Sequence, residues 1–159
     1  DEDGKIAKSG KVNKIVFKKL IESLNQKEKE LLTTSPHVVS YDVKDFDLSF
    51  VKGLSLKDGA ATLVQFTINT IYSSFKIPDR YEEEIILCGG GRKNKFLVEK
   101  LKEDNARIKL IDDYGVDGDF VESQAFAYLA IRSYLKLPIS FPKTTGVDKP
   151  CTGGVIVRN

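Results

Sequence analysis

The sequence predicts an α/β fold with a parallel β–α–β core and packed helices. Two segments indicate strands: the apolar run at residues 85–88, and the alternating run at residues 107–111. The amphipathic segment 93–103 lies between them and predicts a helix. We therefore expect two parallel strands joined by a right-handed crossover. Strand 85–88 should be buried, with the Cys88 thiol packed as a small hydrophobic group.

The amino-terminal part predicts a hairpin and then a helix. Asp3 and Gly4 form a turn signal, so residues 5–7 are expected to be a strand. Asn13 is a candidate cap for a helix that continues to about Asn25. One face of this helix is apolar, and it comprises Val16, Leu20, Ile21 and Leu24.

A long helix is predicted before the first strand. Residues 26–57 are polar and read as loop with short helices. The spacing from Ser55 to Asp58 is that of a capping box, which opens a helix to about Phe75. Its expected buried residues are Leu63, Val64, Phe66, Ile68 and Ile71.

After the second strand we expect a helix over residues 120–137, a loop over 138–154 and a final strand at 155–157. The acidic loop 112–119 superficially suggests a calcium site, but the twelfth position is Gln124 rather than Glu, and we reject it. Asp119 and Glu122 have the spacing of a capping box at the start of the helix.

Composition bounds the function classes. The chain has 159 residues, 41% hydrophobic, and a net charge of +2, which fits a single globular domain. Its early lysines are nearly balanced by acids, so a nucleic-acid site is not expected, and no run is long enough to span a membrane. Cys88 and Cys151 lack metal-like spacing, and His37 is expected in an exposed loop. A reducing cytoplasm fits, and no metal ligands are expected.

The segment with the clearest chemical meaning is Gly89-Gly90-Gly91. Glycines between a strand and a helix let the backbone approach a ligand, and the first helical N–H groups favour an anion. The dinucleotide fingerprint is absent because its third glycine is missing, and no P-loop pattern is present. On the glycines alone, a ligand-free turn is equally compatible. Arg92 and Lys93 are expected to be solvated rather than to bind phosphate.

Several motifs together resemble one known family. They are the Gly89-Gly90-Gly91 loop with Asn94, and the segments 3–7 (DGKIA), 58–63 (DGAATL), 118–130 (GDFVESQAFAYLA) and 137–146 (LPISFPKTTG). The chain resembles the carboxyl-terminal half of anhydro-N-acetylmuramic acid kinases. It departs from the usual family pattern at residues 35–40.

The resemblance implies a fold and an activity. The fold would be one ribonuclease-H-like lobe, residues 1–159, of the superfamily of acetate and sugar kinases, heat-shock ATPases and actin. The activity would be ATP-dependent phosphorylation of 1,6-anhydro-N-acetylmuramic acid with hydrolytic ring opening, in cell-wall recycling, with magnesium brought by the nucleotide. The chain contains no methionine, and we expect it to be part of a longer protein. The amino-terminal lobe, with the phosphate loop and catalytic aspartate, would then lie outside it.

The resemblance also implies residue roles. Gly89, Gly90, Gly91 and Asn94 would contact the nucleotide, and Glu122, Thr144, Thr145 and Gly146 the sugar. Glu122 would also help to place the water that opens the ring. From the residues alone a helix-start carboxylate is better explained by the helix dipole, and Thr144 to Gly146 could equally be a packed loop. A non-catalytic nucleotide- or sugar-binding module on the same fold is the alternative function, and homodimer formation stays open.

Overall fold

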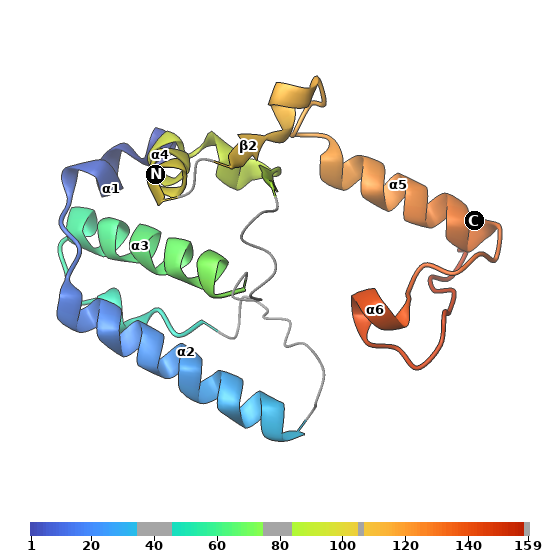
Figure 1. Ribbon diagram of the computed structural model, residues 1–159, viewed down its shortest axis with the longest axis horizontal. Coiled ribbons are helices and arrows are strands. Elements are labelled where there is room, and N and C mark those ends of the chain that lie inside the picture. Colours follow the sequence, from blue (N-terminus) through green and yellow to red (C-terminus); the bar gives the residue numbers. More distant parts are fainter. Residues whose placement is uncertain (35–45, 75–83, 105–106, 158–159) are drawn as a thin grey trace.

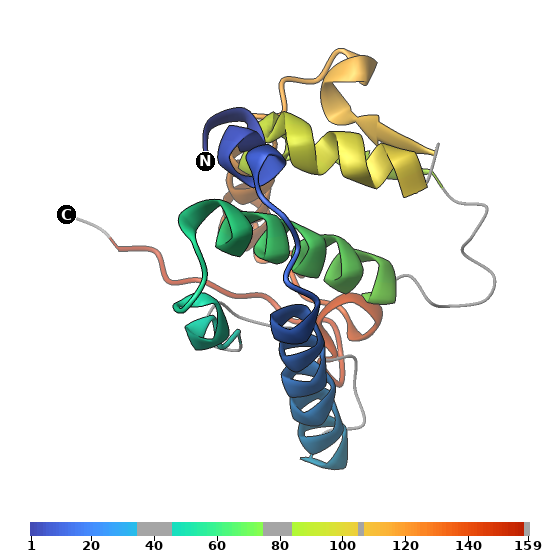
Figure 2. The ribbon, with the colours of Figure 1, turned by 90° about the vertical axis from the view of Figure 1, so that its left-hand side faces the viewer.

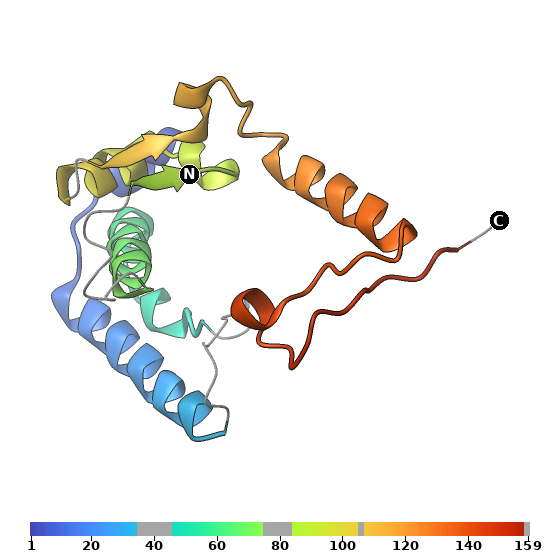
Figure 3. The same cartoon turned by 45° about the vertical axis from the view of Figure 1, so that its right-hand side comes forward.

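The computed structural model describes residues 1–34, 46–74, 84–104 and 107–157. Four helices form the main body, with α3 lying between α2 and α4 (Figures 1 and 2). These are α1 (Lys5–Ser9), α2 (Lys14–Thr34), α3 (Leu56–Ser74) and α4 (Lys95–Asp104). Helices α5 (Val121–Tyr134) and α6 (Pro142–Thr145) stand apart from this body in Figures 1 and 3. None of the described helices is long and apolar enough to cross a membrane.

The described strands form one small parallel sheet. Strand β1 (Ile85–Leu87) pairs with β2 (Ile108–Leu110), with Ile85 opposite Ile108 and Leu87 opposite Leu110. Helix α4 connects the two strands. The predicted α/β class and the parallel β–α–β core are therefore confirmed, although both strands are shorter than expected.

Within the described ranges, four short 3-10 helices lie at the ends of these elements and in the connections. They are η1 (Glu2–Gly4), η3 (Ser49–Val51), η5 (Gly90–Lys93) and η6 (Ile111–Tyr114). Two of them, η5 and η6, follow β1 and β2 at the carboxyl edge of the sheet. Parallel neighbouring strands bring their following segments to the same edge, which is where ligands usually bind in α/β folds.

Two hydrophobic clusters hold the body together. Leu20 and Leu24 of α2 pack on Phe66 of α3. On the other side of α3, Ile68 packs with Leu101 of α4 and Ile108 of β2. The predicted apolar faces of both long helices are thus confirmed.

The predicted caps of α2 and α3 are present. The Asn13 Oδ1 atom accepts hydrogen bonds from the N–H groups of Ile15 and Val16, at 3.1 and 3.0 Å. Ser55 Oγ accepts the Asp58 N–H at 3.2 Å, and α3 begins at the next residue, Leu56. The predicted end of the first helix is wrong, because α2 continues to Thr34. Residues 26–34 are mainly strong helix formers, and they contain no glycine or proline.

The predicted amino-terminal hairpin is wrong. Asp3 and Gly4 do have positive φ values of 57° and 74°, as a type I′ turn requires. However, the Asp1 carboxylate accepts the N–H groups of Ile6 and Ala7, both at 2.9 Å, and so opens helix α1. The turn residues were recognised, but this cap selected a helix instead of a strand.

Predictions near the carboxyl terminus also need correction. Helix α5 ends at Tyr134 rather than residue 137, because Lys136 has a positive φ of 56°. Residues 155–157 are not a strand, and within the described part of the chain they have no pairing partner. The one β-bridge described nearby joins Ser140 to Cys151.

Cys88 is exposed, although a buried position was predicted. The reason is that β1 is covered on one side only: Ile85 and Leu87 pack toward α3 and α4, whereas Ile86 is 45% exposed. His37 and the divergent segment 35–40 lie outside the described residues.

Candidate functional site

The glycine loop lies directly after β1. Gly89 has a φ of +75°, a conformation that L side chains rarely adopt, so this position favours glycine. The φ values of Gly90 and Gly91 do not lie in that region, and a Cβ atom at either would meet no atom within 4 Å. Neither backbone strain nor packing with described residues therefore explains glycine at positions 90 and 91.

The loop exposes hydrogen-bond donors. Gly90 and Gly91 open the 3-10 helix η5, and the first N–H groups of a helix have no acceptor inside it. Helix α4 follows at once, so its positive dipole end lies close to the loop. Bare backbone, N–H donors with no acceptor among the described residues, and a helix start together form a surface that suits an anion.

Asn94 acts as a helix cap. Its Oδ1 atom accepts the Leu97 N–H at 3.0 Å. The same oxygen lies against Gly4, where a Cβ atom would come within 2.2 Å of it. Capping is therefore the role that the contacts of this carboxamide oxygen support, and the nucleotide contact of Asn94 stays a prediction.

Arg92 is the residue that sequence reasoning missed. It was expected to be solvated, but its side chain is only 7% exposed. Nε and Nη2 bind the two oxygens of Asp112 at 2.7 and 3.1 Å, while Nη1 donates to Asp119 Oδ1 at 2.6 Å and to the Gly89 carbonyl at 3.1 Å. Asp117 lies 3.8 Å from Nη2. Arg92 thus connects the glycine loop to the acidic loop after β2.

The charges of this cluster stabilise one another. The hydrogen bond from Arg92 lowers the pKa of Asp112 from 3.8 to about 2. Hydrogen bonds from Lys93 and then Arg92 lower the pKa of Asp119, and the pKa of Arg92 is raised chiefly by Asp112. The acidic loop therefore serves as a partner for these cations. The described residues include no group of three or more His, Cys, Asp and Glu side chains placed to hold a metal.

Gly118 makes this contact sterically feasible. It is buried, and a Cβ atom there would lie 2.2 Å from Arg92 Nε. Its N–H also donates to Asp112 Oδ1 at 3.4 Å. The acidic loop can therefore close over the guanidinium because position 118 has no side chain.

Glu122 lies in the first turn of α5 and is exposed. The predicted capping box is wrong: Phe120 is the N-cap residue, and no side chain caps the helix. The Asp119 carboxylate cannot serve because it binds Arg92 and Lys93. Phe126, one turn further along the same helix, is 64% exposed. The carboxylate of Glu122 is therefore open to a ligand.

Thr144 and Thr145 belong to the short helix α6, and Gly146 ends it with a φ of +71°. Both threonine hydroxyls donate to the Phe141 carbonyl, at 3.2 and 3.1 Å. These three residues are exposed. They lie on the same peripheral unit as Glu122, below α5 in Figure 3.

The loop that carries α6 is tied to the end of α5. Arg132 Nε donates to the Pro138 carbonyl at 2.7 Å, and the Ser133 hydroxyl donates to the Gly153 carbonyl. The bridge between Ser140 and Cys151 closes the loop further along. Helix α5 thus positions both parts of the predicted sugar site, although no contact among the described residues joins Glu122 to Thr144 or Thr145.

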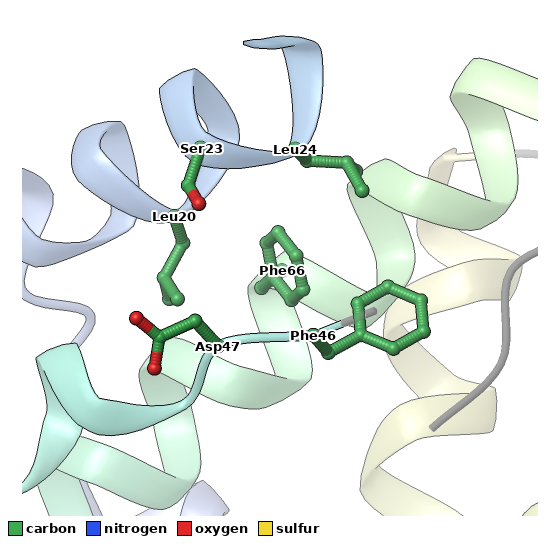
Figure 4. A pocket seen from close by; sticks show the side chains of 6 residues that line it. All are labelled: Leu20, Ser23, Leu24, Phe46, Asp47 and Phe66. Atoms are coloured by element: carbon green, nitrogen blue, oxygen red, sulfur yellow. The ribbon is translucent and has the colours of Figure 1, made fainter. Parts of the chain in front are cut away.

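A small pocket lies elsewhere, between α2, α3 and the segment before η3 (Figure 4). Its lining comprises Leu20, Ser23, Leu24, Phe46, Asp47 and Phe66. Three of these are core residues of the α2–α3 contact. The Asp47 carboxylate accepts the Ser49 N–H at 2.8 Å and so stabilises the local turn. None of the predicted site residues lines this pocket.

Parallel strands followed by a glycine-rich turn into a helix define an α/β protein whose candidate site lies at the carboxyl edge of the sheet. The comparison with known sequences is more specific. The chain belongs to the anhydro-N-acetylmuramic acid kinase family, whose profile matches residues 1–159.

Curated relatives agree with this assignment. An anhydro-N-acetylmuramic acid kinase of Pelagibacter ubique is 50% identical, and the match covers 100% of this chain and 43% of the relative. The Caulobacter vibrioides protein of the same name is 41% identical over 99% of this chain and 41% of its own length. The chain thus spans about two-fifths of the length of these relatives.

Proposed function

We propose that this chain is the nucleotide-binding, carboxyl-terminal lobe of a cytoplasmic sugar kinase. The superfamily fold would be two ribonuclease-H-like lobes, and the other lobe would supply the phosphate loop and the catalytic base. The substrates are ATP, with its magnesium ion, and 1,6-anhydro-N-acetylmuramic acid. Both parts of the candidate site would then face the cleft between the lobes.

The proposed reaction combines hydrolysis with phosphoryl transfer. A water molecule gives one proton to the catalytic base of the other lobe, and its oxygen bonds to C1 of the sugar while the bond from C1 to O6 breaks. O6 takes the γ-phosphoryl group of ATP, and ADP leaves. The product is N-acetylmuramic acid 6-phosphate, an intermediate suited to the recycling of cell-wall sugar.

The observation that carries the nucleotide role is the open glycine loop. The space beside Gly90 and Gly91 is not filled by any described atom within 4 Å of a Cβ position. The N–H groups of these two residues begin a helical turn. Such donors hold phosphate oxygens in place, which is the main task of the protein in phosphoryl transfer. Family membership supports the choice of a nucleotide over other anions.

The sugar role rests on the unit formed by α5 and α6. Glu122 presents an exposed carboxylate, which can accept a hydrogen bond from a sugar hydroxyl or from the attacking water. The Thr144 and Thr145 hydroxyls and the Gly146 backbone offer further polar contacts. In this role Glu122 is an auxiliary group, because the main catalytic base belongs to the other lobe.

The Gly90→Ala variant of the full-length protein tests the nucleotide role. Alanine fits the backbone conformation of Gly90 without strain, and its Cβ atom would meet no described atom within 4 Å, so the fold should be unchanged. We expect ATP affinity, measured by calorimetry, to fall by roughly tenfold or more because a methyl group separates backbone from phosphate. Gly53→Ala is the matched control, since a Cβ atom there also meets nothing within 4 Å. Unchanged ATP affinity in Gly90→Ala would reduce the loop to a simple turn.

A further inference from the structure

Arg92 joins two segments that belong to different halves of the candidate site. It is the third residue of η5, which begins with the glycines of the nucleotide loop. Its partners Asp112 and Asp119 follow β2, and Asp119 lies three residues before Glu122. One side chain therefore bonds to the loop proposed to bind nucleotide and to the segment that leads into α5.

The geometry of this link is specific to arginine. The guanidinium makes a two-point contact with Asp112 and, through Nη1, bonds both Asp119 and the Gly89 carbonyl. The planar fork of arginine fits such an arrangement, whereas a lysine ammonium is a point charge on a flexible stem. Lys93 adds only one bond, to Asp119 Oδ2 at 2.6 Å.

The guanidinium at the centre of this link is enclosed, while its partners Asp112 and Asp119 are 43% and 44% exposed. The Arg92 side chain is 7% exposed, and Gly118 packs directly against its Nε atom. Ion pairs between exposed side chains hold geometry weakly because each partner can exchange with water. An enclosed guanidinium with four hydrogen bonds fixes the relative position of its partners far more strongly.

We propose that Arg92 is a positioning residue that couples the nucleotide loop to the sugar-binding helix α5. This inference rests on the proposed function. Arg92 does not touch either substrate in this account. It holds Gly89 on one side and Asp119 on the other, so that Glu122 keeps a fixed position relative to the bound phosphates.

The two carboxylate partners divide the task. Asp112 anchors the guanidinium in place beside the glycine loop, while Asp119 makes the short hydrogen bond to it from the residues just before α5, and Asp117 lies further off at 3.8 Å. Loss of the Asp119 bonds should therefore release α5 and leave the loop held by Asp112. Loss of the arginine fork should disturb both.

The test compares Arg92→Lys, Asp119→Asn and the control Glu99→Gln in the full-length protein. Glu99 also forms an ion pair, with Lys8 at 2.8 Å, but this pair is exposed and lies outside the Arg92 cluster. Steady-state kinetics would give KM for ATP and for the anhydro sugar separately. We expect Arg92→Lys to raise both KM values and lower kcat, by roughly tenfold or more in kcat/KM. Asp119→Asn should raise the sugar KM and lower kcat, and leave the ATP KM within about twofold.

Hydrogen exchange supplies a second readout. ATP should slow amide exchange in residues 121–134 of the wild type and of Glu99→Gln, but not of Asp119→Asn. A purely structural role would lower the melting temperature and leave both KM values of the folded enzyme unchanged, and that result would overturn the proposal. If Arg92→Lys does not fold, the test rests on Asp119→Asn. The Asp119 side chain is 44% exposed, so this variant should fold. Absence of turnover in the wild type would instead reject the proposed function itself.

Discussion

At the scale of single residues, Glu122 has a role in the proposed reaction that can be separated from folding. It is exposed, and it forms no cap with the backbone of α5. Glu122→Gln keeps the size of the side chain and removes its charge. We expect the melting temperature of the full-length protein to stay nearly constant.

The catalytic effect of Glu122→Gln should be large. If the carboxylate orients the sugar and the water, kcat/KM should fall by roughly a hundredfold, the scale of positioned acid–base and orientation effects. Steady-state kinetics beside thermal melts measure both quantities. Wild-type turnover in this variant would remove Glu122 from the mechanism.

The lowered pKa of Asp112 predicts that the stability of the protein falls in acid. Its folded pKa is lowered from 3.8 to about 2, chiefly by Arg92, with Asp117, Asp119 and Lys93 also close to the cluster. A depressed carboxyl pKa adds stability above about pH 4, and this contribution is lost as the pH falls toward 2. Asp112→Asn should therefore melt below the wild type at pH 6, and the difference should shrink toward pH 2.

The control for this prediction is Asp148→Asn, the same change at an exposed loop position. It should shift the melting temperature little at any of these pH values. A difference between wild type and Asp112→Asn that stays constant from pH 6 to pH 2 would contradict the ion-pair account.

At the scale of elements, the contact between η5 and the acidic loop depends on Gly118. Gly118→Ala places a Cβ atom 2.2 Å from Arg92 Nε. Arg92 cannot move aside without losing its bonds to Asp112 and Asp119. Crowding of this kind typically costs about 1–3 kcal/mol, so we expect a lower melting temperature and weaker ATP binding. Gly53→Ala should show neither effect. A Gly118→Ala variant with the melting temperature and ATP affinity of the wild type would show that the two loops are not coupled.

Local signals in the sequence were sufficient for most helices. Asn13 and Ser55 cap helices through residues at most three positions away, so their effect is readable from spacing. The same logic failed at Asp3 and Gly4, because the turn is followed by a helix that Asp1 caps. It also failed at residues 155–157, since a strand needs a partner that short-range patterns do not reveal.

The Arg92 contact could have been anticipated in part. Its aspartate partners lie twenty or more positions further along the chain, beyond any local pattern. Yet the predicted parallel strands already placed both following loops at one sheet edge. An acidic loop unsuited to calcium, beside a basic pair after the glycines, was a signal for pairing between them.

At the scale of the whole molecule, helix α5 leaves a large apolar surface uncovered by the described residues. Phe126, Ile131 and Tyr134 are 64%, 60% and 70% exposed. Surfaces of this kind usually mark an interface. We expect the isolated chain to associate with itself as concentration rises, which sedimentation velocity would detect. Ile131→Lys should weaken this association, whereas Ile15→Lys, at a residue of α2 that is 72% exposed, should not.

A monomeric chain at all concentrations would contradict that expectation. In the longer protein we propose that the other lobe covers part of this surface and completes the cleft. The chain spans about two-fifths of its relatives' length, which leaves ample polypeptide for a second lobe in a protein of that size.

The most direct test of the account is a phosphorylation assay on the full-length protein. ATP would be supplied with either 1,6-anhydro-N-acetylmuramic acid or N-acetylmuramic acid, and the products would be identified by mass. We expect N-acetylmuramic acid 6-phosphate and one ADP per sugar from the anhydro substrate. Turnover of the other sugar should be far slower, and the isolated 159-residue chain should show none. ATP binding without sugar-dependent ADP release would contradict the kinase assignment and leave a nucleotide-binding module in its place.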